Sequence, residues 1–192
     1  MGAEHRLARA VLEEARRTFV DEIDGLTIDE ALDAAGGFRS ILGLMKHVAG
    51  WAEVYRSFAF DEEPRHWEDT TWPRGLRDRV EATAEYLADI RSWFDRSAVA
   101  WRAAIDASPN LEEERPTHWG GSMPLAEIVA TVAAHWTYHA GEINEILAIR
   151  RGEAWEYGEE VEENHIDTTG HGVRPGWMTE EDASRYEERR RR

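Results

Sequence analysis

The sequence predicts an all-α protein, a four-helix bundle with a C-terminal extension. Four long segments carry apolar residues at helical intervals of three and four, and no segment shows the strict alternation of a half-buried strand. Helices that must each bury one apolar stripe, joined by short to medium loops, pack as a bundle. Because no internal repeat or low-complexity linker interrupts this pattern, we expect one domain over residues 1–152 and an extension over residues 153–192.

The first two helices are predicted over residues 4–22 and 38–59. Asp24–Gly25 is expected to end the first, and Ser40 is a suitable cap for the second. The apolar stripe of the first comprises Leu7, Ala8, Val11, Leu12, Ala15 and Phe19. That of the second comprises Ile41, Leu44, Met45, Val48, Trp51, Ala52 and Tyr55.

The third helix is predicted over residues 76–107, where the apolar stripe continues for the full length. Ser108–Pro109–Asn110 should stop it, and residues 111–121 should form a loop. Ser122 and Pro124 then match the N-cap and first turn of a fourth helix.

The fourth helix is expected to run to a stop at Gly152. Beyond it, the residues around His165 and His171 read as an ordered loop and Thr179 as the cap of a short terminal helix. The two loop histidines would suit a second metal site or, better, a lid over the bundle mouth, although plain loop histidines are the simplest interpretation.

Composition excludes several classes of function. The formal charge of −16 repels phosphate backbones and anionic lipid surfaces, so we expect neither nucleic acid nor membrane as a partner. The chain has no cysteine, which excludes disulfides, thiolate metal ligands and a cysteine nucleophile. The N-terminal residues show no signal-peptide pattern, and we expect a cytoplasmic protein.

Three histidines form a candidate metal triad. His135 and His139 are four residues apart on one predicted helix, so their imidazoles share a face. His47 lies among apolar residues of another helix, and bundles build metal sites from facing side chains. Taken alone, His47 also fits a hydrogen-bonded core histidine, and the pair also fits chance spacing. The pair is not a zincin motif, because Trp136 stands where that motif has its glutamate.

Together these residues give a family resemblance. The stretches SILGLMKHVAGWAEVY (residues 40–55) and HWTYHAGEINEILAIRRG (residues 135–152) resemble those of the DinB-like, or YfiT-like, metal-dependent proteins. The likeness, with the helical pattern around it, covers about residues 5–152. It implies an up-down-down-up four-helix bundle and a metal triad at His47, His135 and His139, usually with zinc or nickel.

The resemblance also implies an activity. Characterised members of that family are thiol-dependent: some transfer bacillithiol or mycothiol, and one branch isomerises maleylpyruvate with mycothiol. We therefore expect a divalent-metal enzyme, a thiol S-transferase or a hydrolase, that activates a low-molecular-weight thiol cosubstrate or water against a small electrophilic substrate. The absence of cysteine fits a nucleophile supplied from outside. A non-enzymatic binding bundle with a structural or vestigial metal is the alternative.

Other residues remain candidates with ordinary alternatives. Glu142 and Glu53 would suit a hydrogen bond to a ligand imidazole or a role as base, although a solvated carboxylate on a helix flank is the simpler interpretation. Tyr138 and Trp51 would suit the pocket lining or simple packing. Aromatic residues are enriched at interfaces, so tryptophans in residues 67–72 and 155–177 would suit a homodimer face. His5, His66 and His118 have no partner at ligand spacing and are given no role.

Overall fold

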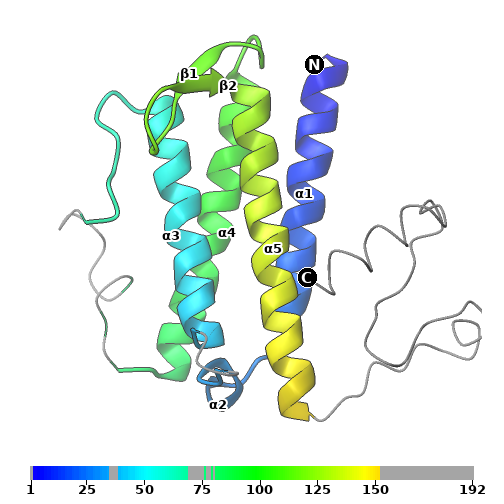
Figure 1. Cartoon of the computed structure of the whole chain (residues 1–192), viewed down its shortest axis with the longest axis vertical. Coiled ribbons are helices and arrows are strands. Elements are labelled where there is room, and N and C mark those ends of the chain that lie inside the picture. The colour runs from blue at the N-terminus through cyan, green and yellow to red at the C-terminus, as the bar shows by residue number, and fades with distance from the viewer. Residues whose placement is uncertain (1, 35–38, 69–75, 77–78, 80, 152–192) are drawn as a thin grey trace, which may run out of the picture. The chain divides into compact units, whose positions relative to one another are not determined.

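The fold is described by a computed structural model, which defines residues 2–34, 39–68, 76, 79 and 81–151. Four long helices form the bundle (Figure 1): α1 (Ala3–Ile23), α3 (Ile41–Phe60), α4 (Ala84–Ala107) and α5 (Leu125–Arg151). Three short elements accompany them: the helix α2 (Ile28–Ala31) and the strands β1 (Glu114–Pro116) and β2 (Ser122–Pro124).

The helices run in the predicted up-down-down-up order. Helices α1 and α5 point one way, and α3 and α4 point the other way (Figure 1). The closest packing is between α1 and α5 and between α3 and α4, and α3 also packs along α5. The prediction of a four-helix bundle is confirmed, and its topology brings the second and last long helices side by side.

Aromatic side chains fill the centre of the bundle. The Phe94 ring lies 4.6 Å from the Phe19 ring and 5.0 Å from the Trp136 ring, measured between centroids. The indole of Trp101 is fully buried and donates from Nε1 to the carbonyl of Ala52 at 2.8 Å, so it joins α4 to α3. This rigid core fixes the spacing of the helices that carry the histidines.

The third long helix is shorter than predicted. It begins at Ala84 instead of residue 76, because Thr83 is extended (φ −124°, ψ 161°) and its side chain accepts a hydrogen bond from the Tyr86 amide. Such an N-cap defines a helix start. The apolar Leu76 is nevertheless buried, so its place in the apolar stripe reflects burial outside the helix.

Residues 111–124 contain a small β-hairpin that the sequence did not predict. Arg115 pairs with Met123 at the centre of the antiparallel register. Gly120 and Gly121 have φ of 92° and 75°, values that glycine adopts without steric cost, and they form the turn. Ser122 is therefore a strand residue and not the predicted N-cap, and the helix starts at Leu125.

The linker after α1 holds the additional helix α2. Thr27 caps it by accepting from the Glu30 amide, while the Glu30 carboxylate accepts from the Thr27 amide. This reciprocal capping box is a known start signal of short helices. At the end of α1, Gly25 has φ of 69°, as expected where Asp24–Gly25 was predicted to end the helix.

The described residues contain no helix long and apolar enough to cross a membrane. Residues His165 and His171, the terminal helix after Thr179 and the tryptophans of residues 155–177 lie outside the described residues. The division into a domain and an extension at residue 152 stays a prediction. Trp67, one of the tryptophans considered for a dimer face, is half-buried and stacks on Trp51 of the same chain.

Candidate metal centre

His47, His135 and His139 converge on one point between α3 and α5. The Nε2 atom of His135 lies 3.1 Å from Nε2 of His47 and 3.1 Å from Nε2 of His139. All three potential ligand atoms lie within 4.8 Å of one another. In a four-coordinate site with metal–nitrogen bonds of about 2.0–2.1 Å, ligand nitrogens are about 3.3 Å apart. The three imidazoles therefore fit a single divalent ion.

Helix geometry explains this convergence. On α5, His135 and His139 are one turn apart and thus share the face that packs along α3. On α3, His47 stands next to the fully buried Val48, on a helix whose position the core determines. Of the three imidazoles, that of His139 is the most buried, with 8% of the residue exposed.

Glu142 holds the ring of His139. Its Oε2 lies 2.6 Å from Nδ1 of His139, one turn further along α5. When Nδ1 donates its proton to the carboxylate, the Nε2 lone pair faces the other two imidazoles. Metal-bound histidines commonly have such a carboxylate behind them. The Tyr138 hydroxyl also donates to Glu142, and this bond raises the pKa of Tyr138.

The other two imidazoles are kept neutral by their surroundings. Burial, with smaller contributions from the charges of His139 and Arg39, lowers the pKa of His47 to about 4. Burial, followed by the neighbouring histidines, lowers the pKa of His135 to about 3. Neutral imidazole is the form that binds metal, so both rings are in the ligating state at neutral pH.

A cavity of about 670 Å³ opens beside the triad. His47 and His139 form part of its wall, and Tyr138 and Glu142 line it next to them. The remaining lining residues are Arg39, Leu44, Gly141, Glu145, Ile146 and Ile149. A small molecule can thus reach the point on which the imidazoles converge. The prediction that Tyr138 lines the pocket is supported by this geometry.

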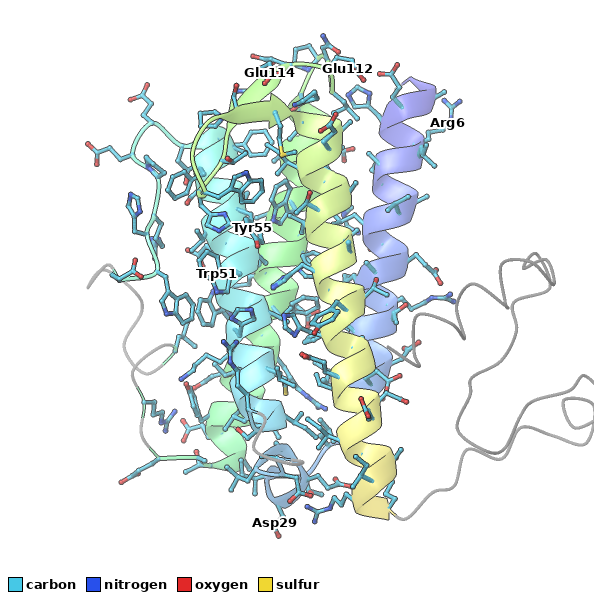
Figure 2. All side chains as sticks on the ribbon, in the orientation of Figure 1. Arg6, Asp29, Trp51, Tyr55, Glu112 and Glu114 are labelled. Atoms are coloured by element: carbon cyan, nitrogen blue, oxygen red, sulfur yellow. The ribbon has the colours of Figure 1, made fainter. Side chains whose placement is uncertain are left out.

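Aromatic residues pack around the triad toward the hairpin. Trp51 and Tyr55 project from the half of α3 nearer the hairpin (Figure 2). The His118 ring lies 4.6 Å from both of theirs, and Tyr55 contacts the His135 ring edge-on at 5.7 Å. Nδ1 of His135 is buried, and the described residues offer it no hydrogen-bond partner. This side of the triad is therefore packed, whereas the cavity side is open.

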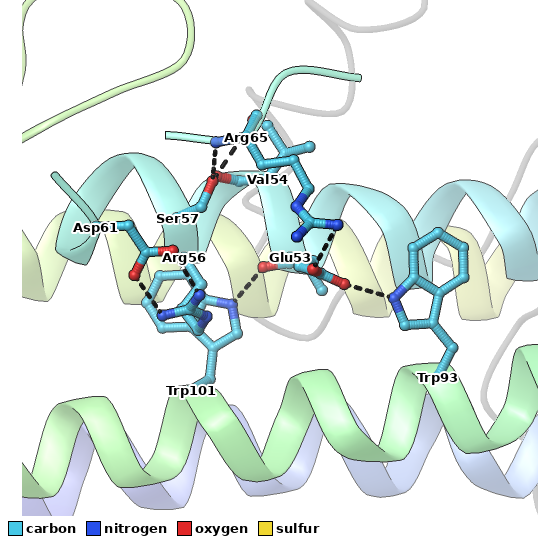
Figure 3. Close-up of polar contacts among 9 residues, drawn as sticks. Glu53, Val54, Arg56, Ser57, Asp61, Arg65, Trp93 and Trp101 are labelled. Atoms are coloured by element: carbon cyan, nitrogen blue, oxygen red, sulfur yellow. Dashed lines mark hydrogen bonds and ion pairs between the residues drawn. The ribbon is translucent and has the colours of Figure 1, made fainter. Parts of the chain in front are cut away.

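Glu53 contacts none of the three histidines. Its carboxylate accepts from Nε1 of Trp93 at 2.7 Å and lies 3.4 Å from the Arg65 guanidinium (Figure 3). These contacts join α3 to α4 and to the segment that follows α3, on another face of the helix. These contacts do not agree with the hypothesis that Glu53 supports a ligand imidazole. The carboxylate that bonds a ligand imidazole is Glu142.

Two residues near the site were not singled out by sequence. Arg39 lines the cavity but precedes the helix cap, and no spacing rule relates it to the histidines. His118 approaches them only because the hairpin folds over α3, which its isolated position in the sequence does not indicate.

His5, given no role, bonds the Ser108 carbonyl at 2.7 Å, and His66 packs on Phe58.

The protein is thus a four-helix bundle with three imidazoles that could hold a metal ion beside an open cavity. The sequence model of the mycothiol-S-transferase family matches residues 7–148. Since this match spans most of the 192 residues, the chain belongs to the mycothiol-S-transferase family. No curated protein matches the sequence.

Solved structures show the same fold. A protein described as a member of the DinB family, from Exiguobacterium sibiricum 255-15, is similar with a TM-score of 0.54 and 16% identity. The match covers 80% of this chain and 96% of that one. A conserved protein from Enterococcus faecalis is similar with a TM-score of 0.56 and 18% identity, over 80% of this chain and 99% of that one. The DinB-like fold is thereby established.

Proposed function

We propose that this protein is a metal-dependent thiol S-transferase that joins a low-molecular-weight thiol to a small electrophile. His47, His135 and His139 would hold a divalent ion, zinc or nickel. The observation that carries the proposal is the convergence of three Nε2 atoms, with 3.1 Å between neighbours, beside a cavity of about 670 Å³. Membership of the mycothiol-S-transferase family supports the choice of a thiol as nucleophile.

A bound divalent ion would supply Lewis acidity, because neutral imidazoles leave its charge intact and a coordinated thiol or water becomes more acidic. The protein's own residues orient the imidazoles and shield the triad. Glu142 fixes the His139 tautomer, and the aromatic packing of Trp51 and Tyr55 shields the triad on the hairpin side. The cavity gives substrates an approach to the triad in the described part of the chain.

The reaction balances without any further reagent. A sulfur–carbon bond forms, the bond between that carbon and its leaving group breaks, and the thiol loses its proton. Glu142 and Glu145 are the carboxylates that line the cavity and can accept this proton. An open site of this kind favours a reactive over a structural role, because structural zinc sites are closed by four protein ligands.

Metal analysis combined with a conjugation assay tests the proposal. Purified protein should contain a stoichiometric divalent ion and should accelerate the coupling of mycothiol to a chromogenic electrophile such as monobromobimane. His47→Ala should lose both properties, since two remaining imidazoles hold an ion weakly. His66→Ala is the matched control, because His66 packs on Phe58 away from the triad. Wild-type protein without metal, or His47→Ala with full activity, would overturn the proposal.

The identity of the nucleophile is tested separately. Mycothiol, bacillithiol and a thiol-free reaction with an activated ester should be compared on the metal-loaded protein. We expect turnover with a thiol and none in its absence. Metal-dependent hydrolysis without thiol would contradict the transferase proposal and favour a hydrolase. A protein that holds its ion and turns over none of these substrates would favour the non-enzymatic alternative.

A further inference from the structure

Arg39 is the arginine among the described residues that line the cavity. In the described part of the chain it makes no hydrogen bond or ion pair, although it lies directly before the cap of α3. Two other arginines at the same end of the bundle are engaged: Arg150 with Asp33, and Arg151 with Glu30 at 3.6 Å. The cavity lining therefore contains a charged donor group with no acceptor among the described residues.

The charges around Arg39 favour an anion once the metal is bound. The other ionised groups of the lining are Glu142, which already accepts from His139 and Tyr138, and Glu145. The positive charge of a divalent ion and Arg39 together exceeds the negative charge of these two carboxylates. The cavity thus becomes a local positive site on a protein whose formal charge is −16. The positive end of the α3 dipole lies at the same place.

Arg39 lines the same cavity as His47 and His139 of the triad. Its charge is one of the influences that lower the pKa of the His47 imidazole, after burial and His139. The lining of this cavity also includes the apolar side chains of Leu44, Ile146 and Ile149. A molecule seated here would place one end at Arg39, its hydrocarbon part on these side chains and its reacting end at the triad.

We propose that Arg39 binds a carboxylate of the substrate and so makes the cavity selective for carboxylate-bearing molecules. The planar guanidinium presents two parallel N–H groups, which match a carboxylate in a bidentate pair. The assignment of the bound molecule as a substrate rests on the proposed thiol transfer. The binding of a carboxylate at Arg39 does not depend on that transfer, and it can be measured without turnover.

Equilibrium binding is the first test. Hexanoate and hexanamide have the same chain and differ in charge, and both can be titrated into the metal-loaded protein by NMR or calorimetry. A charge-assisted hydrogen bond is worth enough for about a tenfold preference or more for hexanoate. Arg39→Gln should weaken hexanoate about tenfold and leave hexanamide unchanged, and Arg39→Lys should retain part of the preference.

Arg96→Gln is the matched control, because Arg96 is exposed on α4 and does not line the cavity. Any direct attraction of hexanoate to the metal ion is common to wild type and variants, so the difference reports Arg39. Equal loss for both ligands would indicate a structural role for Arg39 and would overturn the proposal. An Arg39→Gln protein that behaves like Arg96→Gln would also overturn it.

Turnover then decides which cosubstrate carries the carboxylate. Iodoacetate and iodoacetamide form a matched pair of electrophiles, and N-acetylcysteine and its amide form a matched pair of thiols. Each rate is divided by the uncatalysed rate. Arg39→Gln should lower kcat/KM about tenfold for the charged member of one pair only, which identifies the source. If Arg39→Gln changes the kcat/KM of the charged member in neither pair, Arg39 does not bind a substrate carboxylate. If no pair is turned over, the thiol-transfer proposal fails, while the hexanoate titration still decides whether Arg39 binds carboxylates.

Discussion

The carboxylate of Glu142 lies 2.6 Å from Nδ1 of His139, one helical turn away on α5. This bond determines which nitrogen of His139 carries the proton, and it turns Nε2 toward His135 and His47. A polar contact within one helix thus orients a group that acts between two helices. Among the described residues His139 is the only member of the triad with such a carboxylate, so its orientation should depend on Glu142 as well as on its burial.

Glu142→Ala should lower the zinc affinity by about 10–100-fold, the usual effect of losing a partner behind a metal-bound histidine. Glu142→Gln should have a smaller effect, because the amide oxygen still accepts from Nδ1. Competition with a chromogenic chelator measures both. Glu145→Ala is the control, since Glu145 lines the same cavity and bonds no imidazole in the structure. If Glu145→Ala weakened zinc as much as Glu142→Ala, the effect would be one of cavity charge and not of the His139 bond.

Removal of the metal should make stability sensitive to pH between about 4 and 6.5. In the folded protein burial holds the pKa of His47 at about 4 and that of His135 at about 3, whereas the ordinary histidine pKa, which both take in the unfolded chain, is 6.5. The unfolded chain therefore binds protons in this range that the folded protein does not. Stability rises with pH through the range and is lost as pH falls below 6.5.

The measurement is the Tm of chelator-treated protein at pH 7 and pH 5. His47→Gln should reduce the fall in Tm between these values, because it removes one of the two groups. His66→Gln should not. An equal fall in wild type and His47→Gln would show that other groups, such as the carboxylates, cause the acid sensitivity.

Glu53→Ala should destabilise the fold and leave metal binding intact. The substitution removes the hydrogen bond to Trp93 and the contact with Arg65, which join α3 to α4 and to the following segment. We expect a loss of about 1–3 kcal/mol in the free energy of unfolding, measured in urea. Zinc affinity should match that of wild type. A loss of zinc affinity in a protein that is still folded would show that Glu53 does support the metal site.

The helices and the His135/His139 pair could be predicted because their signals are local, whereas the addition of His47 depended on the family resemblance. Apolar periodicity located all four long helices, and four-residue spacing placed His135 and His139 on one face. The hairpin could not be predicted in the same way. Ser122 and Pro124 satisfy the rules for a helix start, and only pairing with Glu114–Pro116 makes them a strand.

The rest of the cavity depends on contacts between distant segments. Arg39 has no sequence relation to the residues of α5 that line the same space, so its role follows from how α3 is placed against α5. The start of α4 depended on Thr83, a cap inside a stretch whose apolar spacing still looked helical. In both cases the structure depends on contacts between distant segments or on a cap, and the local apolar pattern does not indicate it.

Two glycine substitutions should have opposite effects on stability. Gly50 lies on α3 beneath Trp67, and an added Cβ would come within 2.1 Å of Cζ3 of that indole. Trp67 in turn stacks on Trp51, with 5.9 Å between ring centroids and 7° between planes, and Trp51 contacts His47. Gly50→Ala must displace Trp67, and we expect a loss of about 1–3 kcal/mol in the free energy of unfolding.

Gly141 on α5 is the matched comparison, because an added Cβ there would meet nothing within 4 Å. Alanine is favoured over glycine in a helix interior, so Gly141→Ala should raise the free energy of unfolding by about 0.5–1 kcal/mol. Urea unfolding of the two variants, with Trp fluorescence as the probe, measures both changes. A Gly50→Ala protein as stable as wild type would show that displacing Trp67 from Gly50 costs little stability. The rings of Tyr55 and His118 would then be sufficient neighbours to keep Trp51 beside His47.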